Sequence, residues 1–219
     1  DTTIPVAAFN NCTLLENIHL PYCVDSIGDY AFQDCTSLKR LNSDVDGVFN
    51  IPTPVSVISD YSFNNCSLAE KITLSENVTS IGAYAFANCS LVSKFNSNNA
   101  TEMIVPELCA SIGDYAFKGM ALIANAVVPD SVESVGKGAF NGFNSLESIT
   151  LPFVGESVNS TKMSGVFGYI FGYETYTNCD YGKAYNNYQF MNTKYNFANS
   201  VWQYTYDSMS NTSSSSTYG

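Results

Sequence analysis

Four cysteines occupy one position of a repeated pattern, and thiols at a regular spacing could bind metals or form disulfides. They are Cys12, Cys35, Cys66 and Cys89. The same position holds Met120 and Phe143 in the next two units. An apolar interior slot accepts all three residue types, so we expect buried free thiols here.

The remaining three cysteines do not extend this series. Cys109 replaces a valine at another core position, and Cys23 and Cys179 lie outside the repeated positions. With 7 cysteines in the chain, at least one has no partner within it. A bridge between Cys23 and Cys179 is left open.

The stretch Asn42-x-Asp44-x-Asp46-Gly47 resembles the start of a calcium-binding loop, in which oxygen ligands alternate along the chain. Such a loop needs a bidentate glutamate at residue 53, where this chain has Thr53. A turn without calcium is the better interpretation, and no metal or cofactor is expected.

The chain has one histidine, His19, and any Cys–His or Ser–His nucleophile system would have to use it. Its strand position is polar in most units, and no acidic residue lies at a fixed distance to orient it. Paired carboxylates for glycosidase chemistry stay open by residue type, but no Asp or Glu has an apolar setting that would raise its pKa. The chain is not expected to be an enzyme.

Polar residues recur on both sides of the apolar residue in the first strand of each unit, where they should face solvent. Arg40, Lys71 and Lys94 share one of these positions on units that follow one another. Stacked cations repel unless counter-charge or a ligand is present, although Glu16 and Glu70 could neutralise a simple solvated face. The candidate ligand face comprises Asn17, His19, Arg40, Asn42, Lys71, Thr73, Lys94 and Asn96.

A single repeating unit must position all of these residues. Its phenylalanine recurs with alternating spacings of 23 and 31, at Phe9, Phe32, Phe63, Phe86, Phe117 and Phe140. A fixed period predicts one supersecondary unit stacked on copies of itself. Two apolar positions should form core ladders: Val24, Val55, Val78, Cys109 and Val132 in one, and Ile18, Leu41, Ile72, Phe95 and Ala126 in the other.

Within a unit, Ile18 and Leu20 alternate with polar neighbours as a half-buried strand, and Pro21 ends the strand. The segment from Tyr30 to Cys35 predicts a single helical or 3₁₀ turn. The longer units carry eight extra residues after this strand, and Asp46-Gly47 in the first insert predicts a protruding hairpin. The second insert lacks this pair.

Charge restricts the partners. The chain has 9 basic and 20 acidic residues and a net charge of -11. This balance disfavours nucleic acid and anionic membranes, which bind clustered Lys and Arg. No apolar run is long enough to cross a bilayer. Richness in Ser, Thr, Asn and Tyr favours an extracellular or cell-surface location.

The unit Leu-x-x-Ile-x-Leu-Pro-x-x-Val-x-x-Ile-Gly-x-x-Ala-Phe-x-x-Cys resembles the BspA-type (Treponema pallidum-like) leucine-rich repeat. The resemblance covers about Ile4 to Phe153 and implies a right-handed leucine-rich-repeat solenoid, β-rich with short helical or 3₁₀ turns. The module from Leu151-Pro152-Phe153 to Phe171-Gly172 is similar to one that interrupts such arrays. The family implies a large cell-surface or secreted protein that adheres to host matrix proteins or other cells, and it brings no catalytic residues.

Two regions follow: a repeat array at residues 1–153 and an interrupting or capping module at 154–219, with an irregular Tyr/Asn-rich β region. Residues 1–12 match only the second half of a unit. Trp202, Tyr204 and Tyr206 alternate with polar residues, so hairpins are expected over much of 173–207.

The function expected from these patterns is non-catalytic recognition of a protein or glycan ligand, with an acidic ligand favoured by the cation row. The alternative is a structural subunit that self-associates head to tail into an extracellular filament.

Overall fold

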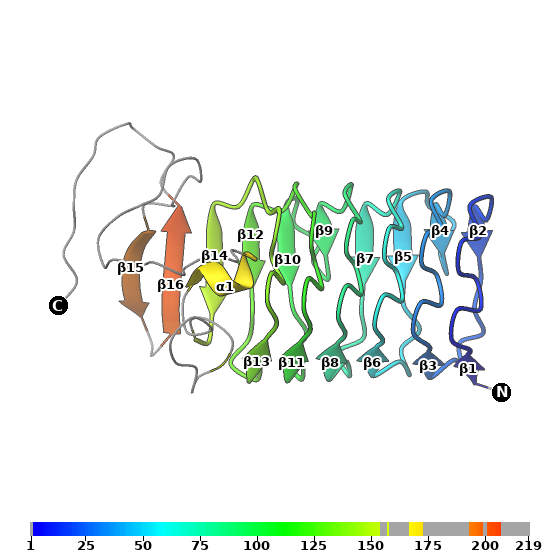
Figure 1. Ribbon diagram of the computed structural model, residues 1–219, viewed down its shortest axis with the longest axis horizontal. Helices are drawn as coiled ribbons and strands as arrows, with labels where there is room; N and C mark the ends of the chain where they lie inside the picture. Colours follow the sequence, from blue (N-terminus) through cyan, green and yellow to red (C-terminus); the bar gives the residue numbers. More distant parts are fainter. Residues whose placement is uncertain (1, 154–156, 158–166, 173–192, 199–200, 207–219) are drawn as a thin grey trace.

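The computed structural model describes residues 2–153, 157, 167–172, 193–198 and 201–206. These residues form an elongated stack of coils with short strands along its two opposite sides (Figure 1). The chain is therefore a parallel β-solenoid with almost no helix, as the repeat period predicts.

One side carries a ten-stranded sheet with the order β15-β16-β14-β12-β10-β9-β7-β5-β4-β2. Its parallel strands are β2 (Asn17–Ile18), β4 (Arg40–Leu41), β5 (Val48–Asn50), β7 (Lys71–Thr73), β9 (Lys94–Phe95), β10 (Glu102–Ile104), β12 (Asn125–Val127) and β14 (Ser148–Leu151). Two antiparallel strands, β16 (Val201–Tyr206) and β15 (Thr193–Ala198), follow β14.

The other side carries shorter strands, one for each coil. They are β1 (Thr3–Ile4), β3 (Ser26–Ile27), β6 (Val57–Ile58), β8 (Ser80–Ile81), β11 (Ser111–Ile112) and β13 (Ser134–Val135). β1 pairs with β3, and β6, β8, β11 and β13 form a separate four-stranded sheet. The pairing is interrupted between β3 and β6, where the first insert adds a strand to the opposite side.

Phenylalanine rings fill the space between the two sides. From Phe9 to Phe140, each ring stacks on its copy in the next coil, with centroid separations of 5.1, 5.3, 5.5, 6.3 and 5.8 Å. All of these rings except the half-buried Phe9 are fully enclosed. The two core ladders predicted from the sequence are also buried, apart from the half-buried Ile18 at one end.

The segment from Tyr30 to Cys35 links neighbouring coils through alternating hydrogen bonds. The amides of Ala31, Gln33 and Cys35 bond within the turn, three residues back, whereas those of Tyr30, Phe32 and Asp34 donate to the next coil. Tyr30 and Asp34 both have φ of 59°, a left-handed conformation that interrupts any helix. The single turn expected here is therefore a run of successive β-turns.

In the cysteine ladder, Cys35, Cys66 and Cys89 are buried and free, as predicted, whereas Cys12 at the end of the stack is free but half-buried. The Sγ of Cys35 donates to the carbonyl of Phe9 at 3.1 Å, and those of Cys66 and Cys89 make the same contact to Phe32 and Phe63 at 3.3 Å. Each thiol thus contacts the phenylalanine ladder of the preceding coil.

The predicted hairpin at the first insert is wrong. β5 runs parallel to β4, and it lies between β4 and β7 in the sheet. Gly47 does turn the chain, with φ of 76°, but its carbonyl accepts hydrogen bonds from Glu70 and Lys71 of the next coil. The insert forms an extra parallel strand because this arrangement gives β5 a hydrogen-bonded neighbour on each side. The second insert adds β10 in the same way.

Beyond residue 153, α1 (Phe167–Ile170) and the residues after it add one more segment to the stack of turns formed by Tyr30–Cys35 and its copies. The amide of Gly138 donates to the carbonyl of Tyr169, and Phe171 lies 6.3 Å from Phe140. The antiparallel pair β15–β16 agrees with the hairpin prediction at residues 193–198 and 201–206, whereas residues 173–192, 199–200 and 207 lie outside the described chain. The proposed division at residue 153 stays a prediction.

Candidate functional site

The candidate ligand face lies on the ten-stranded sheet, where two rows of side chains flank each buried strand residue. The first row, in sheet order, is Asn17, Arg40, Val48, Lys71, Lys94, Glu102, Asn125 and Ser148. The second row is His19, Asn42, Asn50, Thr73, Asn96, Ile104, Val127 and Thr150. Apart from the exposed Asn17 and His19, these residues are half-buried.

The inserted strands change the predicted line of cations. Val48 of β5 lies between Arg40 and Lys71, so these two cations are not on adjacent strands. Arg40 also has a counter-charge, because its Nε lies 3.0 Å from Asp46 Oδ1, an ion pair without hydrogen-bond geometry. Arg40 therefore contributes little free positive charge to the face.

Lys71 and Lys94, in contrast, are direct cross-strand neighbours on β7 and β9. The Nζ of Lys71 donates to the amide oxygen of Asn98 at 2.9 Å, which is a neutral partner. Neither lysine forms an ion pair with a carboxylate of the described chain. The carboxylate of Glu102, which neighbours Lys94, is bonded to Ser97 and Asn99 instead.

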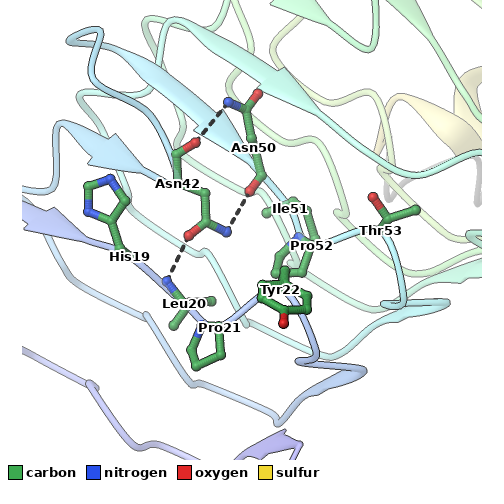
Figure 2. Close-up of a pocket in the computed structure, with 9 residues that line it drawn as sticks. All are labelled: His19, Leu20, Pro21, Tyr22, Asn42, Asn50, Ile51, Pro52 and Thr53. Carbon is green, nitrogen blue, oxygen red and sulfur yellow. Dashed lines mark hydrogen bonds between the residues drawn. The ribbon is translucent and has the colours of Figure 1, made fainter.

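Asn42 and Asn96 open the two inserts, and both have a structural role. Each has a left-handed backbone, with φ of 50° and 52°. The Oδ1 of Asn42 accepts a hydrogen bond from the amide of Leu20 at 2.7 Å, and its Nδ2 donates to the carbonyl of Asn50 (Figure 2). Asn96 Oδ1 accepts the amide of Leu74 in the same way. These amides replace backbone acceptors at the point where the insert leaves the coil.

His19 lies at the edge of the same region, and its side chain is largely exposed. Its Nε2 is 4.0 Å from Asp44 Oδ1, and the two side chains are 65% and 100% exposed. The carboxylates of Asp44 and Asp46 face different side chains, His19 and Arg40. No group of three or more His, Cys, Asp or Glu that could hold a metal occurs in the part of the chain that the structure describes.

The other candidate residues are simpler. Asn17 is exposed at the end of the sheet, and Thr73 is half-buried, with its carbonyl accepting the amide of Ile51. Cys23 is exposed, but Cys179 lies outside the described residues, so their pairing stays untested.

A second aromatic ladder was not predicted. The tyrosines two residues before the ladder phenylalanines stack with centroid separations of 4.9, 4.7 and 5.0 Å. They are Tyr30, Tyr61, Tyr84 and Tyr115, and all have φ between 53° and 59°. Burial raises the pKa of Tyr61 and Tyr84. The spacing of 31, 23 and 31 residues between these tyrosines is the signal that could have identified the ladder.

No helix in the described residues has the length and apolar character of a membrane span. The family described as BspA type Leucine rich repeat region matches residues 2–104 and 92–201, with six copies. None of the curated proteins compared with the chain matches it.

A solved leucine-rich repeat structure shares the fold. A leucine-rich repeat protein of T. pallidum is 25% identical with a TM-score of 0.56, and the match covers 67% of this chain and 61% of that one. A leucine-rich cell surface protein of Faecalibacterium prausnitzii is 23% identical with a TM-score of 0.42, covering 70% and 51%. A leucine-rich repeat protein of Bacteroides ovatus is 22% identical with a TM-score of 0.40, covering 64% and 44%. The chain thus matches less than two thirds of the length of each of these structures.

Proposed function

The chain belongs to the BspA-type leucine-rich repeat family of bacterial surface-type proteins, and we propose from this that it is a non-catalytic recognition array of a cell-surface or secreted adhesin. Its ten-stranded sheet would present the binding face. Repeat proteins bind partners on such regular faces, because every coil contributes side chains at the same position of the sheet.

The observation that supports this role is the Lys71–Lys94 pair. The two residues are Cα partners on neighbouring parallel strands, which lie about 4.8 Å apart. No described carboxylate pairs with either ammonium group, although the chain carries a net charge of -11. Unscreened like charges at this separation repel, and an acidic ligand would remove the repulsion. We infer a sulfated glycan or an acidic protein segment as the partner class.

A charge-matched comparison tests this proposal. Binding to immobilised heparin and to poly-glutamate would be measured over a series of salt concentrations, for the wild type and for Lys71→Gln/Lys94→Gln. The double variant should bind at least about tenfold more weakly and show a smaller salt dependence. Its free energy of unfolding should change by less than about 1 kcal/mol, because both ammonium groups are partly exposed and neither forms an ion pair with a described carboxylate.

The control is Lys118→Gln/Lys137→Gln, which changes the net charge equally in the turn segments. It should bind like the wild type. Equal losses in both variants would mean that only the net charge matters. Unchanged binding of Lys71→Gln/Lys94→Gln would rule out the pair as a binding element. No feature of the described residues favours the filament alternative, so it is not proposed.

A further inference from the structure

A hollow of about 440 Å³ lies beside the first insert. Its lining comes from three stretches of chain: the residues directly after β2, the first residue of the insert, and the last residue of β5 with the segment that follows it (Figure 2). The volume falls within the roughly 300–1,000 Å³ of small-ligand sites. The hollow borders the ligand face, because His19 and Asn42 belong to both.

The hollow exists because the first insert adds a strand to only one side of the stack. On the ten-stranded side, the coil that contains the insert contributes two strands, β4 and β5, between β2 and β7. On the opposite side, the same coil contributes only β6. The segment after Leu20 and the segment after Ile51 are therefore separated by β4, which ends just before Asn42. The side chain of Asn42 bridges this gap, through its bonds to Leu20 and Asn50. This places a fixed amide between the two chain segments that line the hollow.

The side chains around the hollow combine one aromatic surface with uncharged polar groups. The ring of Tyr22 is 91% exposed, so no protein packing covers its faces. The hydroxyls of Tyr22 and Thr53 and the Oδ1 of Asn50 have no hydrogen-bond partner in the described chain. His19, at the rim, contributes an imidazole. No Asp, Glu, Lys or Arg lines the hollow, in a chain with 20 acidic residues.

The corresponding place at the second insert differs in these groups. Asn96 makes the same bond as Asn42, so the local backbone arrangement is similar. Glu76 and Glu107 replace Tyr22 and Thr53, 54 residues later, and Ile104 replaces Asn50. The aromatic surface and the free hydroxyls are therefore particular to the first insert.

We propose that the hollow at the first insert binds an uncharged carbohydrate, with one face of a pyranose packed on the Tyr22 ring. This rests on the recognition role proposed above and names a ligand class for one part of the same surface. A pyranose presents C–H groups on its faces and hydroxyls around its rim. The C–H face matches an open aromatic ring, and the hydroxyls match Thr53, Asn50 and His19. A ligand without charge also suits a lining without charged residues.

A proline-rich peptide is the other ligand that an exposed tyrosine beside Pro21 and Pro52 could accept. Peptides of that kind dock in grooves lined by several aromatic rings. Tyr22 is the only aromatic residue in the lining. The observations therefore favour the carbohydrate.

An oligosaccharide array that carries neutral and sulfated members tests the inference with the 219-residue chain. Wild-type protein should bind at least one neutral oligosaccharide. Tyr22→Ala should weaken that binding by about tenfold or more. The variant should fold like the wild type, as judged by circular dichroism and thermal unfolding, because Tyr22 makes no buried contact. Tyr22→Phe should retain most of the binding, since the stacking surface is kept.

Glu76→Ala is the matched control, at the equivalent position of the second insert, and should bind like the wild type. Binding of neutral sugars that Tyr22→Ala leaves unchanged would overturn the inference. Binding of sulfated members alone, abolished by Lys71→Gln/Lys94→Gln, would also overturn it while supporting the proposed function. Binding of a proline-rich peptide such as decaproline, with no neutral oligosaccharide bound, would assign the hollow to the other ligand.

Discussion

Two aromatic ladders run through the same turn segments, and they differ in what surrounds them. They lie two residues apart in the four coils that carry a tyrosine, at Tyr30, Tyr61, Tyr84 and Tyr115. The phenylalanine rings, such as Phe86, are fully buried, and Phe95 adds an edge contact at 5.2 Å. The tyrosine rings, such as Tyr84, stack just as closely but stay partly exposed at their edges.

The difference shows that a regular stack does not by itself make a core. Ring centroids of neighbouring copies are 5.1 to 6.3 Å apart in the phenylalanine ladder and 4.7 to 5.0 Å apart in the tyrosine ladder. Only the phenylalanines are enclosed by both strand sides, so only they remove their whole surface from water. The tyrosines have a further disadvantage, since their left-handed backbone is unfavourable for residues other than glycine. We therefore expect the two ladders to respond very differently to perturbation.

The largest difference should appear in thiol reactivity, because the cysteines report on burial beside the phenylalanine ladder. Under native conditions, Cys66 and Cys89 should react with iodoacetamide at least about a thousandfold more slowly than the exposed Cys23, since reaction requires the stack to open. Mass spectrometry after timed labelling measures both rates. Rapid native labelling of Cys66 would show that the ladder is accessible to solvent.

Phe86→Ala should destabilise the chain by about 3–5 kcal/mol. The substitution removes ring contacts to Phe63, Phe95 and Phe117 and leaves a cavity between coils. Urea unfolding followed by circular dichroism gives the value. Phe86→Leu should cost less, because it keeps more of the buried volume. A loss for Phe86→Ala below about 1 kcal/mol would contradict the enclosed ladder.

Alkaline pH should destabilise the fold through the buried thiols beside the phenylalanine ladder. Burial raises the pKa of Cys89 to about 12 and that of Cys35 to about 11, so the folded state holds these protons more tightly than the unfolded chain does. Their contribution is complete below the unfolded thiol pKa of about 8.5 and is lost as pH rises toward 11 to 12. Each such thiol adds a slope of up to about 1.4 kcal/mol per pH unit to the free energy of unfolding. Between pH 8 and 11, the free energy of unfolding should therefore fall less steeply with pH for Cys89→Ala than for the wild type. Equal slopes for the two proteins would exclude the Cys89 thiol as the cause.

The smallest effect is expected at the surface ladder. Tyr84→Ala should cost about 1–2 kcal/mol, since it removes stacking on Tyr61 and Tyr115 but little buried area. Tyr84→Gly should be less destabilising than Tyr84→Ala, because glycine adopts the φ of 53° without strain. Tyr84→Phe, which keeps the stack, should be nearly neutral. A larger loss for glycine than for alanine would argue against the left-handed backbone.

The phenylalanine ladder could be predicted from the sequence, because residues of one type that recur at a fixed period must face the same environment. Phe86, Val78 and Cys89 are buried for this reason. The seventh ring, Phe171, was missed although it follows Phe140 by the same interval of 31. The residues that flank Phe171 in the sequence differ from those of the repeated unit, so the repeat pattern did not identify this phenylalanine.

The candidate face was less predictable, because its geometry depends on how the inserts pair. The Asp46-Gly47 signal is local, whereas β5 pairs in parallel with β4 and with β7 of the next coil. The added strand, which separates Arg40 from Lys71, therefore did not follow from that signal. Asn42 was assigned to the ligand face by its alternation with the core. Its left-handed backbone and bond to Leu20 arise only because the chain leaves the strand there.

The alternation of short and long coils also has a mechanical consequence. Each coil contacts only its neighbours, so a chain pulled from its two ends should lose coils one at a time. A fully extended residue spans at most about 3.6 Å, so successive releases would add about 80 Å for a short coil and about 110 Å for a long one. Under tension the array would thus extend in steps of two alternating lengths, set by whether the released coil carries one strand or two on the ten-stranded side.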